Sequence, residues 1–244
     1  TGIQCQQHGG MKTSHPTIIA FASPKGGVGK STSCLSIASA LAKQGHTVHI
    51  IDYDQTETLW DWYSNRADKQ QFPTLTVEKA PDVPLKDYIH KLMELEYDYL
   101  LIDLAGTLTK DMLYLGVAAD LTITPSKLNV PDTLQASKLV DDLKLIGKRL
   151  GKAINHRILV NDVPTLLSNA QAHTLAEIDR NQLPRFQTII YTRPAAYTEA
   201  HYTGLPPHFS DTSRSTIARA IDEIDQLVAE IHSITNKSEE NIAA

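Results

Sequence analysis

A short glycine-rich segment near the start of the chain carries the residue types that bind phosphate groups. It spans residues 23–32 and reads Ser-Pro-Lys-Gly-Gly-Val-Gly-Lys-Ser-Thr. Glycines let backbone N–H groups close around phosphate oxygens, a lysine reaches the β- and γ-phosphates, and a serine hydroxyl can ligate Mg²⁺. An apolar run precedes the segment and a helical pattern follows it, as a P-loop requires. We therefore expect ATP and Mg²⁺ to bind here, at Gly26, Gly27, Val28, Gly29, Lys30, Ser31 and Thr32.

Aspartates end two of the apolar runs that follow this segment. Residues 50–51 lead into Asp52-Tyr53-Asp54, and residues 99–102 lead into Asp103. A carboxylate at the end of a buried strand beside a P-loop can hold Mg²⁺ through water, and we assign this role to Asp103. Phosphoryl transfer depends mostly on positioning and charge, so these carboxylates need no large pKa shift. For Asp52 and Asp54, an acidic cap at the strand end is the alternative.

The elements that must position these residues are short apolar or β-rich runs separated by helix-length segments. This alternation predicts a mainly parallel β-sheet with helices on both faces, in an α/β single-domain P-loop NTPase fold. The expected strands are 17–23, 47–52, 75–79, 99–103, 121–124, 157–160 and 188–191. A helix is expected after the first strand, because Cys34, Ile37, Ala38 and Leu41 recur at helical spacing before Gly45.

The domain limits follow from this pattern. The ATPase domain is expected over 17–236, and its last long helix over about 213–234. Residues 1–16 are polar and are expected to be a disordered leader or an expression scar, with Met11 just before the first apolar run. A flexible tail is expected over 237–244.

Composition limits the functional classes. The 244 residues carry a net charge of -5, so nucleic-acid binding would need a local basic patch. The two cysteines, Cys5 and Cys34, offer neither a disulfide framework nor metal-ligand spacing, which fits a reducing cytoplasm. No run of eighteen apolar residues occurs, so we expect a cytoplasmic protein without a membrane anchor.

The phosphate-binding segment resembles the deviant Walker A loop of the ParA/MinD superfamily of P-loop ATPases. The family signature Lys-Gly-Gly-x-x-Gly-Lys-Ser/Thr is matched at every fixed position from Lys25 to Ser31, and Pro24 or Ser23 stands where the general pattern has its first glycine. The resemblance implies a homodimer formed with ATP, in which Lys25 reaches the nucleotide of the facing subunit. The sequence shows no obvious partner for Lys25 within its own subunit.

The same resemblance gives roles to the carboxylates. It implies that Asp54 positions or activates the attacking water and that Asp52 supports Mg²⁺ and the loop. The family usually continues Pro-Gln after this motif, whereas Gln55-Thr56 follows here. Gly106 occupies the family's switch position, with a plain loop glycine as the alternative. The implied catalytic set is Lys25, Lys30, Asp54 and Asp103, and the implied metal set is Ser31, Asp52 and Asp103.

Beyond the loop, the resemblance runs from about residue 17 to 234. It is closest to small ParA-type plasmid partition ATPases and to VirC-type conjugative ATPases, which share a tryptophan-containing stretch, here Trp60 and Trp62. These tryptophans serve either packing or base stacking. Family adenine contacts fall at Asn161 and around Pro206, where a helix cap and a simple turn are the alternatives.

The implied function is DNA segregation or positioning. An ATP-bound dimer would bind DNA non-specifically, associate with the nucleoid, and hydrolyse ATP when a centromere-binding or cargo adaptor protein stimulates it. Candidate DNA contacts are Arg193, Arg214 and Arg219, and a second basic group comprises Lys144, Lys148, Arg149 and Lys152; a solvated helix face is the alternative for the latter. An acidic last helix disfavours a membrane-binding terminus. The alternative function is an ATP-dependent small-molecule synthase or amidotransferase of the cobyrinate-synthase type.

Overall fold

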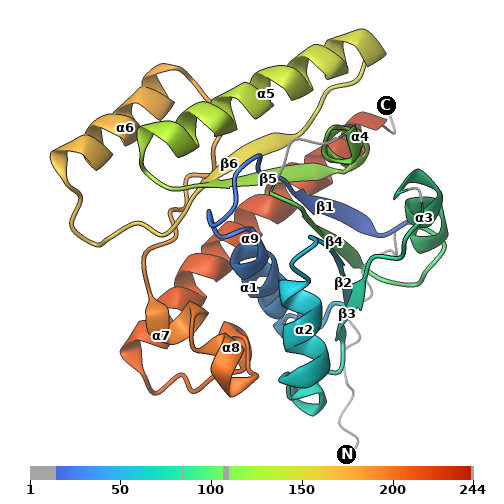
Figure 1. The fold of residues 1–244 in the computed structure, drawn as a ribbon, viewed down its shortest axis with the longest axis vertical. Helices are drawn as coiled ribbons and strands as arrows, with labels where there is room; N and C mark the ends of the chain where they lie inside the picture. The colour runs from blue at the N-terminus through green and yellow to red at the C-terminus, as the bar shows by residue number, and fades with distance from the viewer. Residues whose placement is uncertain (1–14, 84, 107–109, 243–244) are drawn as a thin grey trace, which may run out of the picture.

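The computed structural model describes residues 15–83, 85–106 and 110–242. Its centre is a six-stranded sheet in the order β3-β2-β4-β1-β5-β6 (Figure 1), and every neighbouring pair of strands is parallel. Because all strands run the same way, their carboxyl ends lie along one edge, where an open α/β sheet binds its ligand. The strands are β1 (Thr17–Phe21), β2 (Val48–Tyr53), β3 (Leu75–Lys79), β4 (Tyr99–Leu104), β5 (Leu121–Ser126) and β6 (His156–Val160).

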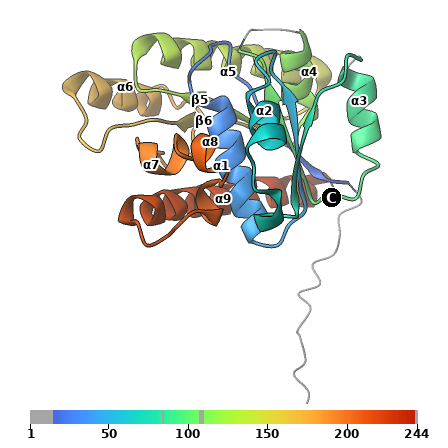
Figure 2. The same ribbon diagram turned by 60° about the horizontal axis from the view of Figure 1, so that its bottom comes forward.

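Helices cover both faces of the sheet. One core lies between the sheet and the helices α1, α2 and α9, and another lies between the opposite face and α3, α4 and α5. Figure 2 shows α1 and α3 on opposite sides of the strands. The helices are α1 (Lys30–Lys43), α2 (Thr58–Asn65), η1 (Lys69–Gln71), α3 (Leu85–Leu92), α4 (Lys110–Ala118), α5 (Val130–Leu150), α6 (Asn169–Arg180), α7 (Pro194–Tyr197), α8 (Ala200–Thr203), η2 (Pro207–Phe209) and α9 (Ser215–Ile242).

Alternation along the strands explains how one sheet serves two cores. In β1, Ile19 and Phe21 pack toward α1 and α9, whereas Ile18 and Ala20 pack toward α3, α4 and α5. Successive side chains of a strand point to opposite faces, so a strand covered on both faces must be apolar throughout. The expected α/β fold with helices on both faces is therefore confirmed.

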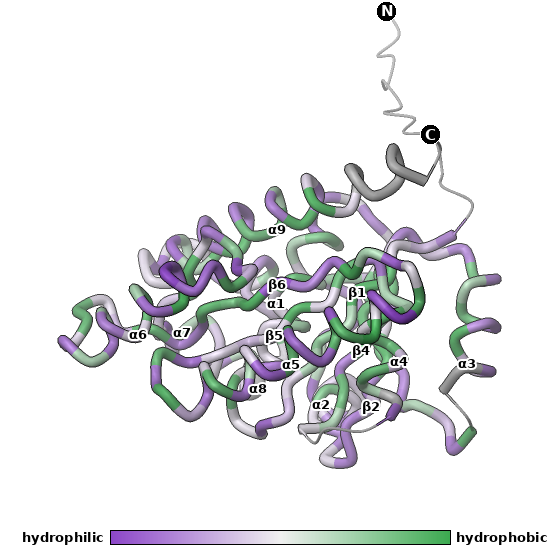
Figure 3. Tube along the Cα trace, turned by 90° about the horizontal axis from the view of Figure 1, so that it is seen from above, coloured by the Kyte–Doolittle hydropathy of each residue, from purple (hydrophilic) through white to green (hydrophobic). Residues whose placement is uncertain are grey.

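Helix α1 follows the expected pattern. Its stripe of Cys34, Ile37, Ala38 and Leu41 is fully buried, and Gly45 follows the helix at φ +95, a left-handed conformation that favours glycine. The amphipathic α9 alternates between hydrophobic and hydrophilic residues up to residue 235 (Figure 3). Within the described ranges, no helix is long and apolar enough to cross a membrane.

Two expectations need correction. Residues 188–191 do not form a strand: only an isolated bridge joins Tyr191 to Val163. The physical reason is a competing acceptor, because the N–H groups of Gln187 and Thr188 donate to the Glu230 carboxylate of α9. The last helix is also longer than the expected 213–234, since α9 continues to Ile242. The predicted leader, with Cys5 and Met11, lies outside the described residues except at 15 and 16.

Candidate functional site

The glycine-rich loop joins the end of β1 to the start of α1, as the sequence predicted. Gly27 and Gly29 have φ values of +74 and +95, which side chains rarely adopt. Gly29 also lies against Asn161, because a Cβ at this position would come within 2.1 Å of the Asn161 Nδ2 atom. Asn161 Nδ2 donates a hydrogen bond to the carbonyl oxygen of Val28 at 2.9 Å. The loop is thus shaped by its glycines and held from the end of β6.

A cavity of about 540 Å³ opens over this loop. Lys30, whose side chain is almost buried, lies in its wall, and its Nζ atom is 3.9 Å from Asp54 Oδ2. Gly106 closes another wall, because a Cβ there would lie 3.1 Å from the Gly26 nitrogen. The cavity is lined by Gly26, Gly27, Gly29, Lys30, Ser31, Thr32, Asp54, Gln55, Thr56, Thr58, Ala105 and Gly106. It therefore combines a helix N-terminus, a buried cation and carboxylate oxygens, the groups that a P-loop site requires.

Asp103 is the most deeply buried carboxylate of the site. It pairs in register with Phe21 of β1 and with Asp52 of β2, so it lies at the carboxyl edge of the sheet beneath the loop. Its side chain is 0% exposed, and neither carboxylate oxygen has a hydrogen-bond partner among the described residues. Burial raises the pKa of Asp103 to about 7, which the Ser31 hydroxyl opposes and the Asp52 charge reinforces. An unpartnered buried carboxylate beside a serine hydroxyl fits a divalent cation.

The resemblance implies that Asp52 supports both Mg²⁺ and the loop, and the contacts of its carboxylate are with the loop and the start of α2. Its Oδ2 atom accepts hydrogen bonds from the N–H groups of Leu59 and Trp60, both at 2.9 Å, and its Oδ1 atom accepts one from Asp54 at 3.2 Å. Burial raises the pKa of Asp52, and these three hydrogen bonds oppose the rise. Because both oxygens are engaged, Asp52 holds the start of α2 and the loop before it; the geometry favours the loop role over direct metal ligation.

Asp54 lies at the rim of the cavity with one oxygen engaged. Its Oδ1 atom accepts from the N–H and hydroxyl of Thr56 at 3.0 and 2.9 Å. Its Oδ2 atom faces Lys30. Thr56, which stands within the departure from the family pattern, therefore orients the carboxylate.

Lys25 contradicts one expectation, because it does have a partner within its own subunit. Its ammonium group is paired with the carboxylate of Asp132 in the first turn of α5. The sequence suggested no role for Asp132. The available signal was a capping pattern: Asn129 accepts a hydrogen bond from the Asp132 N–H group, which fixes Asp132 at the helix start. The partner could not be foreseen because it is 107 positions away along the chain.

Of the two residues expected to contact adenine, Asn161 lines a cavity beside the phosphate loop, whereas Pro206 is not among the residues that line it. A second cavity of about 270 Å³ continues from the first, since both are lined by Gly27, Gly29 and Thr32. Its other lining residues are Lys127, Asn161, Asp162, Tyr191, Tyr197 and Thr198. Lys127 and Asp162, which the sequence did not suggest, form an ion pair at 2.8 Å. This cavity offers a planar base both aromatic and polar contacts.

Pro206 lies elsewhere. It precedes η2, whose His208 hydrogen-bonds Ser39 of α1. Ser39 is nine positions beyond Lys30, roughly 13 Å along the helix. The structure therefore does not bring Pro206 to the phosphate loop, because the segment after α8 packs on the middle of α1 instead of on its start.

The remaining residues that the sequence suggested, a tryptophan and three arginines, differ in their exposure and in their ion pairs. Trp62 is a core residue: it is 1% exposed, stacks on Phe72, and donates to the Ala200 carbonyl. Arg193 is not an open surface cation, because its side chain is 11% exposed and paired with Glu223. Arg214 is exposed but paired with Glu199 at 2.6 Å. Arg219 is exposed on α9 and has no ion-pair partner among the described residues.

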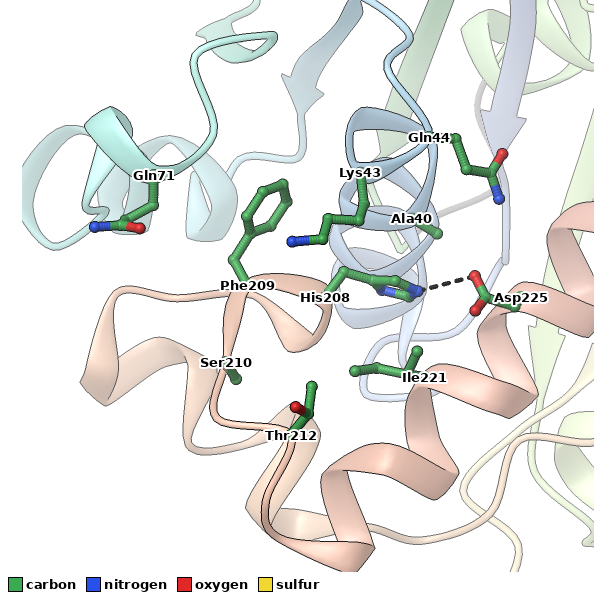
Figure 4. Close-up of a pocket in the computed structure, with 10 residues that line it drawn as sticks. All are labelled: Ala40, Lys43, Gln44, Gln71, His208, Phe209, Ser210, Thr212, Ile221 and Asp225. Carbon is green, nitrogen blue, oxygen red and sulfur yellow. Dashed lines mark hydrogen bonds and ion pairs between the residues drawn. The ribbon is translucent and has the colours of Figure 1, made fainter.

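A larger cavity, of about 700 Å³, lies at the other end of α1 between η2 and α9. Figure 4 shows His208 pointing at Asp225, and their Nε2 and Oδ1 atoms are 3.1 Å apart. The Nδ1 atom of His208 faces Ser39 Oγ at 3.1 Å, so the order is that of a Ser-His-Asp triad. Ser39 cannot act as a nucleophile, however, because it is 0% exposed and its hydroxyl donates to the Ser36 carbonyl. The three side chains join α1, η2 and α9.

Comparisons with known proteins identify the family of the chain. The family model described as VirC1 protein matches residues 17–241. The VirC1 protein of Rhizobium radiobacter is 29% identical over 133 residues, covering 52% of this chain and 58% of its own length, which is less than two thirds. The ParA protein of Rhizobium radiobacter is 23% identical over 214 residues, covering 85% of this chain and 92% of its own length.

Solved structures share the fold. The ATP complex of a McdA variant from Cyanothece superposes with a TM-score of 0.66 at 16% identity, covering 89% of this chain and 96% of the other. The cobyrinic acid a,c-diamide synthase of Mycobacterium smegmatis, with bound ADP and magnesium, superposes with a TM-score of 0.60 at 18% identity. The match covers 78% of this chain and 97% of the other. With the family model matched over nearly all of the described chain, the protein belongs to the VirC1 family of ParA/MinD-type P-loop ATPases.

Proposed function

We propose that this chain is a DNA-positioning ATPase that binds Mg²⁺-ATP in the cavity over Lys25–Thr32, dimerises with ATP, and binds DNA without sequence preference. A centromere-binding or cargo adaptor protein would stimulate hydrolysis and so release the dimer from DNA. The observation that carries the proposal is the meeting of Lys30, Ser31 and Asp54 in one cavity, with the fully buried Asp103 carboxylate close to all three. Membership of a family of partition and positioning ATPases sets the class.

Binding of the triphosphate rests on Lys30 and the loop. The buried ammonium of Lys30 neutralises the β- and γ-phosphate oxygens, and the backbone N–H groups of the loop donate to them. Without nucleotide, the positive charge of Lys30 is balanced by the Asp54 carboxylate, whose Oδ2 atom is 3.9 Å from Lys30 Nζ. An incoming phosphate replaces a single long contact with several short, charge-assisted ones.

Hydrolysis requires a water in line with the γ-phosphate. Asp54 can accept a hydrogen bond from that water through Oδ2, because Thr56 already occupies Oδ1. The Asp52 carboxylate keeps this loop in place through the N–H groups at the start of α2. Asp54 therefore orients the water instead of binding phosphate.

Mg²⁺ fits the Ser31 and Asp103 pair. The Ser31 hydroxyl lies at the start of α1 beside the buried Asp103 carboxylate, whose oxygens form no hydrogen bond of ordinary geometry among the described residues. When bound, the ion would neutralise charge that develops on the phosphate oxygens. Ser31 and Asp103 would hold it, directly and through water respectively.

DNA binding is assigned to the exposed basic residues of α9, chiefly Arg219, with Arg214 beside it at the helix start. Their chemistry suits phosphate contacts, which carry no sequence information and weaken as salt rises. A dimer would present two such patches on an otherwise acidic protein. Two weak contacts made at once would raise the affinity for DNA above that of either contact alone. The basic group around Lys144 and Lys148 is the other candidate surface.

The test is ATP turnover measured with and without random duplex DNA. We expect DNA to raise turnover or to retain the protein only when ATP is present. The double change Arg214→Glu and Arg219→Glu should abolish retention while sparing ATP binding; Arg180→Glu, an exposed arginine on α6, is the control. Unchanged retention would mean either that the protein binds DNA through the basic residues of α5 or that it has no such DNA-binding surface. Turnover that needs a small carboxylic acid and ignores DNA would instead support the cobyrinate-synthase alternative.

A further inference from the structure

A tight turn sets the direction of the Asp54 carboxylate, to which the proposed function assigns the attacking water. The Glu57 N–H group donates to the Asp54 carbonyl oxygen at 3.0 Å, which closes the turn just before α2. Inside the turn, Thr56 donates to Asp54 Oδ1 through its N–H and hydroxyl groups. The Thr56 and Thr58 hydroxyls are 3.1 Å apart, and Thr58 is the donor because the Thr56 proton is directed at Asp54. The direction of the carboxylate therefore depends on the conformation of residues 54–58.

Glu57 has a backbone conformation that its residue type disfavours. Its φ and ψ angles are 51° and 33°, in the left-handed region that glycine adopts readily and that a Cβ atom makes costly. Glu57 lies between the two threonines, so a return to right-handed angles would separate their hydroxyls and release Thr56 from Asp54. A disfavoured conformation of this kind persists only where surrounding contacts hold it.

An ion pair with Lys79 supplies such a contact, because the Lys79 Nζ atom is 2.5 Å from Glu57 Oε1. Lys79 is the last residue of β3 and pairs in register with Asp52 of β2, and the N–H group of Ala80 donates to the Asp52 carbonyl oxygen at 3.0 Å. The sheet thus fixes the Lys79 backbone, whereas Glu57 belongs to a loop. The two side chains are 52% and 38% exposed, and pairs so exposed add little to the free energy of unfolding. The ion pair therefore acts locally, on the conformation of the turn.

We propose that Lys79 is a positioning residue for ATP hydrolysis. Through Glu57 it keeps the turn in the left-handed conformation, in which Asp54 Oδ2 faces Lys30 and the phosphate cavity. Lys79 is not among the residues that line this cavity, so it has no part in binding the phosphates. Without the ion pair, the turn spends less time in the conformation that orients the water, and the rate of hydrolysis falls. This inference rests on the water-orienting role of Asp54 in the proposed function.

Single-turnover hydrolysis of pre-bound ATP, measured together with ATP affinity, tests the inference. Lys79→Met removes the charge and keeps most of the length of the side chain. We expect hydrolysis to slow by about tenfold, because small misplacements near reacting groups have effects of this order or larger, while ATP affinity and thermal unfolding stay close to those of the parent. Glu57→Ala, which keeps the Cβ atom but not the carboxylate, should slow hydrolysis to the same extent. Lys91→Met, at an exposed lysine of α3, is the control and should match the parent.

Glu57→Gly separates a positioning role from any other role of Lys79. Glycine adopts the left-handed conformation without help from a side chain, so adding Glu57→Gly to Lys79→Met should restore most of the lost rate. A double variant as slow as Lys79→Met alone would overturn the inference. If Asp54→Ala hydrolyses ATP at the parent rate, the water-orienting role fails and this inference fails with it. If Asp54→Ala is slow while Lys79→Met keeps the parent rate, the inference fails and the proposed function stands.

Discussion

Asn161 and Val28 are 133 positions apart in the chain, yet the Asn161 side chain donates a hydrogen bond to the Val28 carbonyl oxygen. The residue that follows β6 thereby holds the glycine loop that follows β1. Gly29 leaves the space for this contact, since a Cβ there would collide with the Asn161 amide. The loop conformation therefore depends on a side chain from the far end of the sheet, whether or not that side chain also touches a base.

Asn161→Ala should lower ATP affinity about tenfold and leave the fold intact. The change removes one buried hydrogen bond and leaves the Val28 carbonyl without its partner, a loss of about 1–2 kcal/mol in loop stability. Isothermal titration with ATP measures the effect. Asn155→Ala is the matched control, because its amide also donates to a backbone carbonyl, at 3.1 Å, but at an exposed site away from the loop. Equal affinities in the two variants would contradict the role given to Asn161.

Lys30→Ala should abolish measurable ATP binding. The lysine is the buried cation of the cavity, and no other residue lining that cavity is cationic. Thermal unfolding of the nucleotide-free variant should stay close to that of the parent, since the ion pair that Lys30 forms within the described ranges is a long one, 3.9 Å from Asp54. Lys91→Ala, an exposed lysine on α3, serves as control. Retained ATP affinity in Lys30→Ala would refute the site.

The sequence was sufficient for the elements that have a strong local signal. The buried stripe of α1, the stop at Gly45 and the strands β1 to β6 follow from periodicity and turn residues, to within about two residues at their ends. The phosphate loop also follows, because its glycines, lysine and serine are contiguous. Asp103 could be placed because a parallel sheet brings the carboxyl ends of β1 and β4 together.

The parts that could not be predicted depend on contacts between distant segments. The Thr188–Tyr191 run has strand composition, but Glu230 of α9 captures the N–H group of Thr188 that a strand ladder would use. Pro206 resembles an adenine contact in sequence, yet packing of η2 on α1 carries it away. Lys25 was expected to have no obvious partner within its own subunit, but it pairs with Asp132, which lies 107 positions away along the chain. The local pattern determines an element, and tertiary packing determines its neighbours.

Asp54→Ala should bind ATP with near-parent affinity and hydrolyse it at least a hundredfold more slowly. Asp54 is assigned to the water and not to the phosphates, and loss of a positioned base commonly costs two to four powers of ten in rate. Single-turnover hydrolysis after ATP loading measures the step without product release. Asp61→Ala, an exposed aspartate on the neighbouring α2, should hydrolyse at the parent rate. Parent-level turnover in Asp54→Ala would mean that another residue orients the water.

Asp103 links the chemistry of the site to the stability of the fold. A carboxyl group whose pKa rises on folding, here to about 7 through burial, binds its proton more tightly in the folded chain than in the unfolded one. The resulting stabilisation is complete below the unfolded pKa, near 4, and is lost as the pH rises through about 7. Above that pH, the nucleotide-free protein keeps an unpaired charge in its core.

Asp103→Asn should therefore flatten the dependence of stability on pH. Without metal or nucleotide, the free energy of unfolding of the parent should fall, relative to the variant, by on the order of a few kcal/mol between pH 5 and pH 8. Urea titrations in the presence of a chelator measure this difference, and Asp141→Asn, exposed on α5, should follow the parent. The comparison uses the change with pH, because the buried amide itself alters stability equally at both pH values. Parallel curves for the parent and Asp103→Asn would show that Asp103 is not held as an uncompensated carboxylate, and would remove the physical basis for a cation at this position.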